Sequence, residues 1–309
     1  MTKQISQGVL IILLSFAILL VGCQKNSINQ KPALQGTKTS TKSTPVEEVS
    51  SPVLLAKSGI PAALPWENDS DFLAAKEKYG ATMLVASFCT VLKDPLPGEE
   101  SNVHLGAKYL KGTVVEPGVI FSQNRKVGPY SWGRGFKLGP AYLGSAVKSC
   151  VGGGVCKIAS TLYNVTVLSN LPVIERYPHR MPVPYVPYGQ DATVSYGNKD
   201  FKFKNTTDTP ILIWAQGVDN RLYMGFYGQS KSPKVEWHHQ WLKTYATRKI
   251  YRANYQLPKG EEKVMVEGMD GGVVKSWVTL TLADGTKSEK SLGKSYYDPL
   301  PYIIDVGKK

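Results

Sequence analysis

Three consecutive glycines at positions 152–154 lie just before Cys156. Glycine adopts positive φ angles at no steric cost, so this run allows a sharp turn and a close approach of other atoms to the backbone. From Cys156 onward, apolar side chains recur at spacings that predict a buried helical face, which ends near Asn170 and Pro172. The chain is therefore expected to pass from a tight loop directly into a helix, with the cysteine at the junction.

The position of Cys156 in the first helical turn has a chemical consequence. Unpaired backbone N–H groups and the helix dipole favour negative charge there, so the pKa of a thiol falls and the thiolate becomes available at neutral pH. The alternative is a structural cysteine buried after a flexible turn, because free cysteine is among the most buried residue types. This segment alone leaves both interpretations open.

The first 23 residues indicate the compartment. Lys3 precedes an apolar core at 9–21, and the segment 20–23 is a small-residue cleavage site that ends in Cys23. This pattern is typical of a lipoprotein signal peptide, after which Cys23 becomes the lipidated N-terminus. An uncleaved membrane anchor is the alternative, although the apolar stretch is shorter than the roughly 20 residues that a spanning helix needs. We expect an extracytoplasmic protein that is anchored by lipid to the outer face of the cytoplasmic membrane and reaches into the cell wall.

Composition divides the rest of the chain. Residues 24–66 are rich in Asn, Gln, Lys, Thr, Ser and Pro and almost free of aromatic residues, which predicts a flexible linker. The remainder is long enough for one medium and one small domain, which we place at 67–229 and 230–309. Few helices beside many antiparallel strands predict an α+β fold for the first domain. The second has no helical pattern and is predicted to be all β, with turns at 258–260 and 284–285.

Within the first domain, local patterns predict the individual elements. Helices are expected near 69–79 and 103–110, and strands near 83–91, 114–121, 137–147, 192–196, 201–204, 211–216 and 222–227.

The formal net charge of +13 raises the question of an anionic partner. No recognition helix, RNP motif or zinc finger occurs in the sequence, so we expect no nucleic-acid partner. A secreted basic protein meets anionic wall polymers and lipid headgroups instead. The charges are spread over the linker and both domains, and a merely soluble basic surface is the alternative.

Several motifs follow one another in a specific order. They are GTVVEPGVIFSQN at 112–124, VGP at 127–129, GGGVC at 152–156, ERYPH at 175–179 and YVPYGQDATV at 185–194. Together they resemble the VanW family, named from the vancomycin B-type resistance cluster, over roughly residues 84–227. The resemblance implies a cell-envelope context rather than a particular reaction. Where the family usually has Gln after its cysteine, this chain has Lys157, so a side chain that could donate to an oxyanion is replaced.

The C-terminal part carries a second set of motifs. It contains LPKGE at 257–261, glycines at 268 and 271–272, DG at 284–285, YYDP at 296–299 and PYIIDVG at 301–307. These resemble the G5 domain. The resemblance implies association with the cell surface and binding to polymers that contain N-acetylglucosamine.

Three residues supply the types that a thiol enzyme needs. A cysteine nucleophile requires a base and usually a third group that orients the base. Cys156, His179 and Asp191 occur in that order, which resembles papain-like and NlpC-type wall peptidases in residue type and order. The alternative is that His179 is a loop histidine and Asp191 caps a turn. Candidate substrate-binding residues lie nearby: Gly152, Gly153, Gly154, Ser160, Thr161, Arg180, Tyr185 and Tyr188.

We expect neither a metal nor a cofactor. His238 and His239 lack the spacing that places two imidazoles on one helical face, and the sequence contains no CxxC motif.

Besides Cys23, the chain has three cysteines, an odd number for an extracytoplasmic protein. One disulfide and one free thiol are the simplest expectation. Cys89 and Cys150 are the expected pair, because neither lies at a cysteine position of the resembled family. A Cys150–Cys156 bridge is the rival pairing and would remove the nucleophile, and three reduced thiols are the remaining possibility.

Two functional hypotheses follow. In the first, which we favour from the sequence, both domains bind peptidoglycan or a related wall polymer without cleaving it. In the second, the protein is a peptidoglycan hydrolase or transferase that uses Cys156 and His179. An accessible thiolate close to His179 would favour the second.

Overall fold

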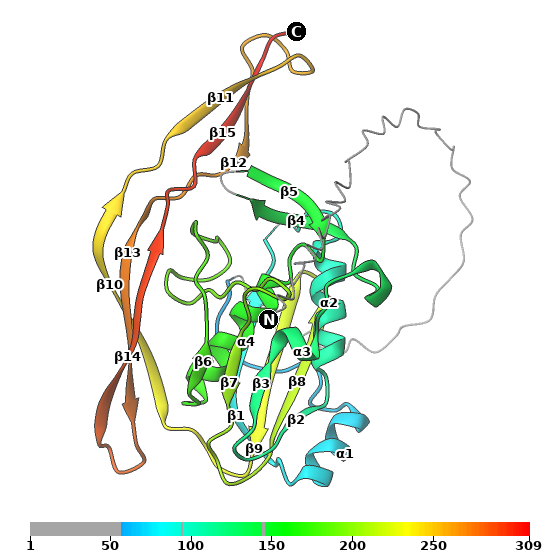
Figure 1. Ribbon diagram of the computed structural model, residues 1–309, viewed down its shortest axis with the longest axis vertical. Helices are drawn as coiled ribbons and strands as arrows, with labels where there is room; N and C mark the ends of the chain where they lie inside the picture. Colours follow the sequence, from blue (N-terminus) through cyan, green and yellow to red (C-terminus); the bar gives the residue numbers. More distant parts are fainter. Residues whose placement is uncertain (1–56, 94, 144–145) are drawn as a thin grey trace, which may run out of the picture. The chain divides into compact units, whose positions relative to one another are not determined.

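The computed structural model describes residues 57–309 except 94 and 144–145 (Figure 1). The predicted signal peptide, Cys23 and most of the predicted linker lie outside the described residues. In the part that is described, none of the helices has the length and apolar character needed to cross a membrane.

An antiparallel four-stranded sheet organises the N-terminal part of the described chain. Its strands follow the order β1-β9-β8-β2, with bounds β1 (Met83–Val91), β9 (Arg221–Gly228), β8 (Ile211–Val218) and β2 (Thr113–Val115). Successive strand residues point to opposite faces, so Phe88 and its neighbour Cys89 enter two different apolar clusters. The sheet is therefore buried on both faces.

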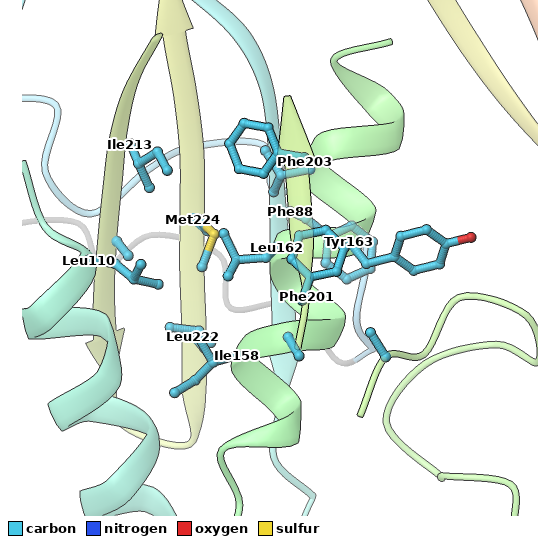
Figure 2. Close-up of a cluster of buried hydrophobic side chains, with 14 of the residues drawn as sticks. Phe88, Leu110, Ile158, Leu162, Tyr163, Phe201, Phe203, Ile213, Leu222 and Met224 are labelled. Carbon is cyan, nitrogen blue, oxygen red and sulfur yellow. The ribbon is translucent and has the colours of Figure 1, made fainter. Parts of the chain in front are cut away.

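Two helices cover the face that carries Phe88. They are α2 (Glu99–Leu110) and α4 (Cys156–Leu168). Leu110 of α2 and both Ile158 and Leu162 of α4 pack in the main core with Met224 of β9 (Figure 2). All residues of α4 from Ile158 onward are buried, as is typical of a helix that lies inside a domain rather than on its surface.

The opposite face of the sheet is covered by α1 (Ser70–Tyr79) and the segment that precedes it. The Asp69 side chain caps α1 by accepting from the backbone N–H groups of Asp71 and Phe72. The Phe72 ring packs against the rings of Trp214 and Tyr227 at centroid distances of 5.2 and 4.8 Å.

The remaining elements of this part are short. They are β3 (Ile120–Ser122), α3 (Gln123–Lys126), the 3₁₀ helix η1 (Trp132–Arg134), β4 (Leu138–Leu143), β5 (Ala146–Val151), β6 (Val173–Glu175) and β7 (Lys202–Lys204). Strands β3, β7 and β6 form one small sheet, and β4 and β5 form a hairpin.

The C-terminal part is all β, as predicted. One antiparallel sheet has the order β10-β13-β14, with β10 (Lys234–Tyr245), β13 (Gly271–Thr281) and β14 (Lys287–Tyr297). In a second sheet, β15 (Tyr302–Gly307) lies between a parallel β11 (Lys249–Asn254) and an antiparallel β12 (Glu262–Val266). The first sheet packs on α4, because the Trp237 ring lies edge-on to Tyr163 at 5.7 Å and Val278 enters the main core.

Most predicted elements are present, and the α+β fold class with a following all-β part is confirmed. Three strand predictions were wrong in detail. The single strand at 114–121 is two strands, β2 and β3, because Pro117 lacks an N–H and Gly118 turns the chain at φ 76°. The predicted strand at 137–147 covers β4 and the first two residues of β5, which pair with each other as a hairpin. Residues 192–196 form no strand, since Ala192 donates its N–H to the Ser160 hydroxyl and Thr193 donates to a loop carbonyl.

The linker prediction extends too far toward its C-terminal end. Gly59 exchanges two backbone hydrogen bonds with Cys89 of β1, at 2.9 and 2.8 Å. Leu64 and Trp66 are buried in the cluster beneath α1. The segment 59–66 is short, contains two prolines and has no helical or strand period, so the sequence pattern did not reveal that it packs on the sheet.

A substitution of Trp66 tests whether the folded domain begins before residue 66. Its side chain is fully buried, and its Nε1 donates to the Tyr227 hydroxyl at 2.8 Å. Trp66→Ala is expected to lower the free energy of unfolding by about 3–5 kcal/mol in urea titrations. Ile60→Ala, at a side chain that is 65% exposed, is the control and is expected to change it by less than about 0.5 kcal/mol. Equal stabilities of the two variants would show that residues 59–66 do not belong to the folded domain.

Candidate functional site

The glycine run turns tightly against the β4 strand and delivers Cys156 to the start of α4. A Cβ atom at Gly153 would lie 2.1 Å from the carbonyl carbon and oxygen of Gly139. Gly152 and Gly154 have φ angles of 78° and 99°, which favour glycine. Val155 is the N-cap, so Cys156 is the first helical residue, as predicted. Close backbone packing therefore accounts for the glycines.

The need for glycine at 153 can be measured. Gly153→Ala is expected to destabilise the fold by about 3 kcal/mol or more, because both clashing groups are backbone and neither can move away easily. Gly133→Ala is the matched control, since a Cβ there meets nothing within 4 Å, and it should leave stability unchanged or raise it by up to about 1 kcal/mol. Chemical denaturation of both variants makes the comparison. A Gly153→Ala protein as stable as wild type would contradict the tight turn.

The structure brings Cys156, His179 and Asp191 together. His179 hydrogen-bonds the Cys156 thiol and holds the carboxylate of Asp191 through Nδ1, at 2.7 Å from Oδ2. The Cys156 Sγ also lies 3.3 Å from the Thr193 hydroxyl and 3.7 Å from the Val194 carbonyl oxygen. The thiol, the imidazole and the carboxylate therefore form one continuous set of contacts.

Asp191 is the most enclosed member of the group, with 1% of its side chain exposed. Its Oδ2 also accepts from the backbone N–H of His179 at 2.6 Å. Its Oδ1 accepts from Arg176 Nη2 at 3.1 Å and from the Tyr297 hydroxyl at 2.5 Å. Both oxygens are therefore fully used, and the carboxylate has a fixed orientation.

The electrostatics favour a thiolate beside an imidazolium. Burial by itself raises the pKa of Cys156, but the hydrogen bond and the charge of His179 outweigh it and lower the pKa to about 7. Burial by itself lowers the pKa of His179, but the hydrogen bonds with Asp191 and Cys156 raise it to about 9. Although burial opposes ionisation of Asp191, His179 and Arg176 hold the pKa of its carboxyl group at about 2. Between pH 7 and 9, these directions give an ion pair of Cys156 and His179.

The pair opens into a cavity of about 800 Å³. Cys156 and His179 are in its wall, as are Gly152, Gly153 and Gly154. Aromatic side chains also line it, namely Tyr130, Tyr185 and Tyr196. Cys156 is partly exposed, and a cavity of this size can admit a small-molecule ligand.

Lys157, the departure from the resembled family, also lies in the cavity wall. Its ammonium group forms an ion pair with Glu99 of α2 and lies 4.7 Å from the centre of the Tyr185 ring. Glu99 Oε2 accepts from the Leu96 N–H as well. The pair is largely buried, so it contributes a fixed part of the wall rather than a mobile charge.

Other predicted site residues lie elsewhere or have structural roles. Ser160 exchanges hydrogen bonds with the backbone of Ala192, and Thr161 bonds Thr90 across the core. Arg180 is exposed and pairs with Asp298. Tyr188 donates to the Asp270 carbonyl and packs on other aromatic rings away from the cavity. The polar groups of these side chains therefore bind other parts of the protein, whereas Tyr185 lines the cavity.

Sequence reasoning missed the groups that hold Asp191 and Cys156 in place. Arg176 lies in the ERYPH motif, three residues before His179, but nothing in the motif indicates its role. Thr193 and Tyr297 also lie in the motifs given above, but their roles depend on contacts across the chain that a local pattern does not show. In the part of the chain that is described, no three His, Cys, Asp or Glu side chains form a group that could hold a metal ion.

The disulfide prediction was wrong, because Cys89, Cys150 and Cys156 are all free thiols. Cys89 lies in the cluster beneath α1, on the face of β1 opposite the main core, whereas Cys150 and Cys156 line the cavity. The sheet therefore separates the two cysteines that were expected to pair. Burial raises the pKa of Cys89 to about 12, so this thiol is unreactive.

The protein is thus of the class with an α+β domain in which a buried helix presents Cys156 to His179 and Asp191. Residues 98–227 match the family described as VanW like protein, and the chain carries a VanW-like domain. It is 35% identical over 191 residues to the uncharacterized protein YoaR of Bacillus subtilis (strain 168), covering 62% of this chain and 58% of that protein. It is also 31% identical over 139 residues to the vancomycin B-type resistance protein VanW of Enterococcus faecalis (strain ATCC 700802 / V583), covering 43% and 50%.

The matches thus span only 58% and 50% of the length of these two curated relatives. Among solved structures, it is similar to the G5 domain of an IgA1 protease, with 20% identity and a TM-score of 0.16 over 25% of this chain and 93% of that one.

Proposed function

We propose that the protein is a cysteine-dependent acyl-transfer enzyme of the cell envelope, a hydrolase or transferase that acts on peptidoglycan peptides. One observation carries this proposal: Cys156 begins a buried helix, its thiol hydrogen-bonds His179 and lines a large cavity, and His179 in turn hydrogen-bonds Asp191. A merely structural cysteine needs neither the histidine nor the cavity. The geometry therefore favours the enzyme hypothesis over binding alone.

The reaction follows from these groups. The Cys156 thiolate attacks the carbonyl carbon of an amide, and a C–S bond forms as the C–N bond breaks. The His179 imidazolium gives its proton to the departing amine, and Asp191 keeps the imidazole oriented. Water or a second amine then releases the acyl group from sulfur, with His179 as the base that accepts its proton. The first outcome is hydrolysis and the second is transfer.

The negative charge that develops on the substrate oxygen needs donors. Among the residues that the structure describes, the backbone N–H groups of Gly154 and Cys156 donate to no acceptor. They lie at the turn that leads into α4, where the helix dipole also favours negative charge. We propose that these backbone groups take the place of the side-chain donor that Lys157 replaces.

The substrate class rests on the envelope context. The chain carries a VanW-like domain, and one relative is described as a vancomycin resistance protein. Peptides of the cell wall supply amide bonds in that compartment. Incubation of purified protein with defined muropeptides, followed by mass spectrometry, tests the proposal.

We expect new products with wild type and with Cys89→Ala, whose buried thiol lies on the other face of the sheet. Cys156→Ala should form none. If folded wild type converts no muropeptide, or if Cys156→Ala converts as much as wild type, the proposed reaction is wrong.

A second function, wall-polymer binding by residues 230–309, is favoured by exposed aromatic side chains. Tyr251 and Tyr255 are 55% and 76% exposed on or beside the strands of this part. Aromatic rings present flat apolar faces on which sugar rings can stack. The full chain should sediment with purified cell wall, Tyr251→Ala/Tyr255→Ala should do so less, and Cys156→Ala should bind as wild type. Protein that stays in the supernatant at low salt would contradict wall binding.

Lipid anchoring through Cys23 is also a proposal. It is supported by the cleavage pattern at 20–23. Cys23→Ser should leave an unprocessed precursor that incorporates no labelled palmitate, and equal labelling of the variant would overturn the anchor.

A further inference from the structure

Strand β14 of the C-terminal part reaches the acid of the proposed site. The Tyr297 hydroxyl donates to Asp191 Oδ1 at 2.5 Å and accepts from the Gly189 N–H at 2.8 Å. Tyr297 and Asp191 are 2% and 1% exposed. A hydrogen bond between a hydroxyl and a buried carboxylate is stronger than one between neutral groups.

A second contact from the same strand acts through Arg176. Its guanidinium donates to the Ser295 hydroxyl at 2.9 Å, to Asp191 Oδ1 at 3.1 Å and to the Asp191 carbonyl at 2.7 Å. Arg176 thus links β14 to both the side chain and the backbone of Asp191. The arginine lies 4.9 Å from the centre of the Tyr163 ring, which limits its movement.

The loop before Asp191 is held by the same sheet. A Cβ atom on Gly189 would lie 2.2 Å from the Ser276 hydroxyl of β13. The Gln190 amide lies 3.1 Å from His239 Nε2 of β10. All three strands of the C-terminal sheet therefore contact residues 189–191.

From these contacts we infer that the C-terminal sheet is part of the reaction centre, and that Tyr297 is a positioning residue that orients His179 through Asp191. The inference rests on the proposed function, because it concerns the same cysteine and histidine. Asp191 uses Oδ2 for His179 and Oδ1 for Arg176 and Tyr297. Removal of the tyrosine hydroxyl frees the carboxylate to rotate, and the imidazole loses its fixed direction toward sulfur.

A consequence concerns how the two parts of the chain work together. A C-terminal part that only bound the wall could be removed without effect on the thiol. The hydrogen bonds from Tyr297 and Ser295 instead make the reactivity of Cys156 depend on how this sheet is seated.

The test compares Tyr297→Phe with Tyr296→Phe in the full chain. The first removes one buried oxygen and keeps the ring, whereas Tyr296 is 62% exposed and adjacent. Iodoacetamide labelling of Cys156 is followed from pH 5 to 9 by peptide mapping. Tyr297→Phe should move the midpoint upward by about half to one pH unit, which slows labelling at pH 6 roughly 3- to 10-fold. Tyr296→Phe should match wild type.

A purely structural tyrosine would lower stability without moving this midpoint. Ser295→Ala removes only the hydrogen bond to Arg176. It should raise the labelling midpoint by a smaller amount than Tyr297→Phe. If Tyr297→Phe does not fold, the midpoint of Ser295→Ala is the deciding measurement. Wild-type midpoints in both Tyr297→Phe and Ser295→Ala would overturn the inference.

A separate readout distinguishes this inference from the proposed function. The His179 Hδ1 proton should give a downfield NMR signal that exchanges slowly in wild type and is lost in Tyr297→Phe. If wild-type Cys156 labels like a free thiol, the proposed enzyme is wrong, and the NMR comparison still judges the role of Tyr297. An unchanged signal in Tyr297→Phe would count against the positioning role.

Discussion

Cys156 is expected to react with iodoacetamide with a midpoint near pH 7, set by its lowered pKa of about 7. A free cysteine ionises near pH 8.5, so at pH 6 Cys156 should carry roughly 30-fold more thiolate than a free thiol. Cys89, whose pKa is raised to about 12 by burial, should stay unlabelled. Rates from pH 5 to 9 with peptide mapping provide the measurement.

The lowered pKa of Cys156 is caused by His179, so a variant of His179 is the control for this prediction. His179→Gln removes the imidazolium that stabilises the thiolate, so the Cys156 pKa should rise and labelling at pH 6 should slow by roughly 30-fold or more. Because the pKa of His179 is raised to about 9, the stabilisation persists as the pH rises and is lost only near pH 9. A Cys156 that is labelled only after denaturation would mean that the cysteine is structural.

Arg176→Ala is expected to lower the free energy of unfolding by about 3–5 kcal/mol, because it leaves the buried Asp191 carboxylate without its arginine. The Arg176 side chain is 9% exposed. Arg180→Ala is the matched control, since Arg180 is 84% exposed and pairs with a surface aspartate, and its unfolding midpoint in urea should equal that of wild type. Equal midpoints for all three proteins would contradict a structural role of the Arg176–Asp191 pair.

The pKa of Asp191 also predicts how the stability difference between wild type and Arg176→Ala depends on pH. The pKa of Asp191 is lowered to about 2 in the folded protein, against about 3.9 in an unfolded chain. Its ionised form therefore stabilises the fold fully above pH 4, and this contribution is lost as the pH falls from about 4 to 2. The stability gap between wild type and Arg176→Ala should narrow over the same range.

The hydrogen bond between Tyr297 of β14 and Asp191 connects the C-terminal part of the chain with the proposed reaction site. The part of the chain that carries the exposed Tyr251 and Tyr255, proposed above to bind a wall polymer, also carries Tyr297, which hydrogen-bonds Asp191. Binding and thiol chemistry would then occur on one rigid arrangement of strands rather than on two independent domains. The comparison of Tyr297→Phe with Tyr296→Phe examines this link directly.

Several features were accessible from the sequence because their causes are local. The glycines at 152–154 followed by Cys156 predicted a turn into a helix, since glycine conformation and helix termini act over a few residues. The absence of a helical period after residue 230 predicted an all-β part. Asp69 before a helix and the turns at 258–260 and 284–285 belong to the same group, as they depend on short-range backbone chemistry.

Other features were decided only by the tertiary structure. Trp66 ends a short segment with two prolines and no regular period, and only its packing against the sheet shows that it is buried. Cys89 and Cys150 could not be excluded as a disulfide until β1 placed them on different sides of the domain. Residues 192–196 have strand-like composition but bond to Ser160 and the loop at Tyr177 instead.

For the site itself, residue types alone indicated Cys156, His179 and Asp191, because a thiol enzyme needs a base and an orienting acid. Whether the three side chains meet, and in which ionisation state, depends on the loop that carries Asp191. Residues far away in the sequence hold this loop in place, such as Tyr297, which is 106 positions from Asp191. A sequence pattern reports interactions within a turn or along a strand, whereas a buried carboxylate takes its partners from wherever the fold brings a donor. The local sequence therefore determined the place of the cysteine at the start of a helix, and contacts between distant segments determined its partners and its ionisation state.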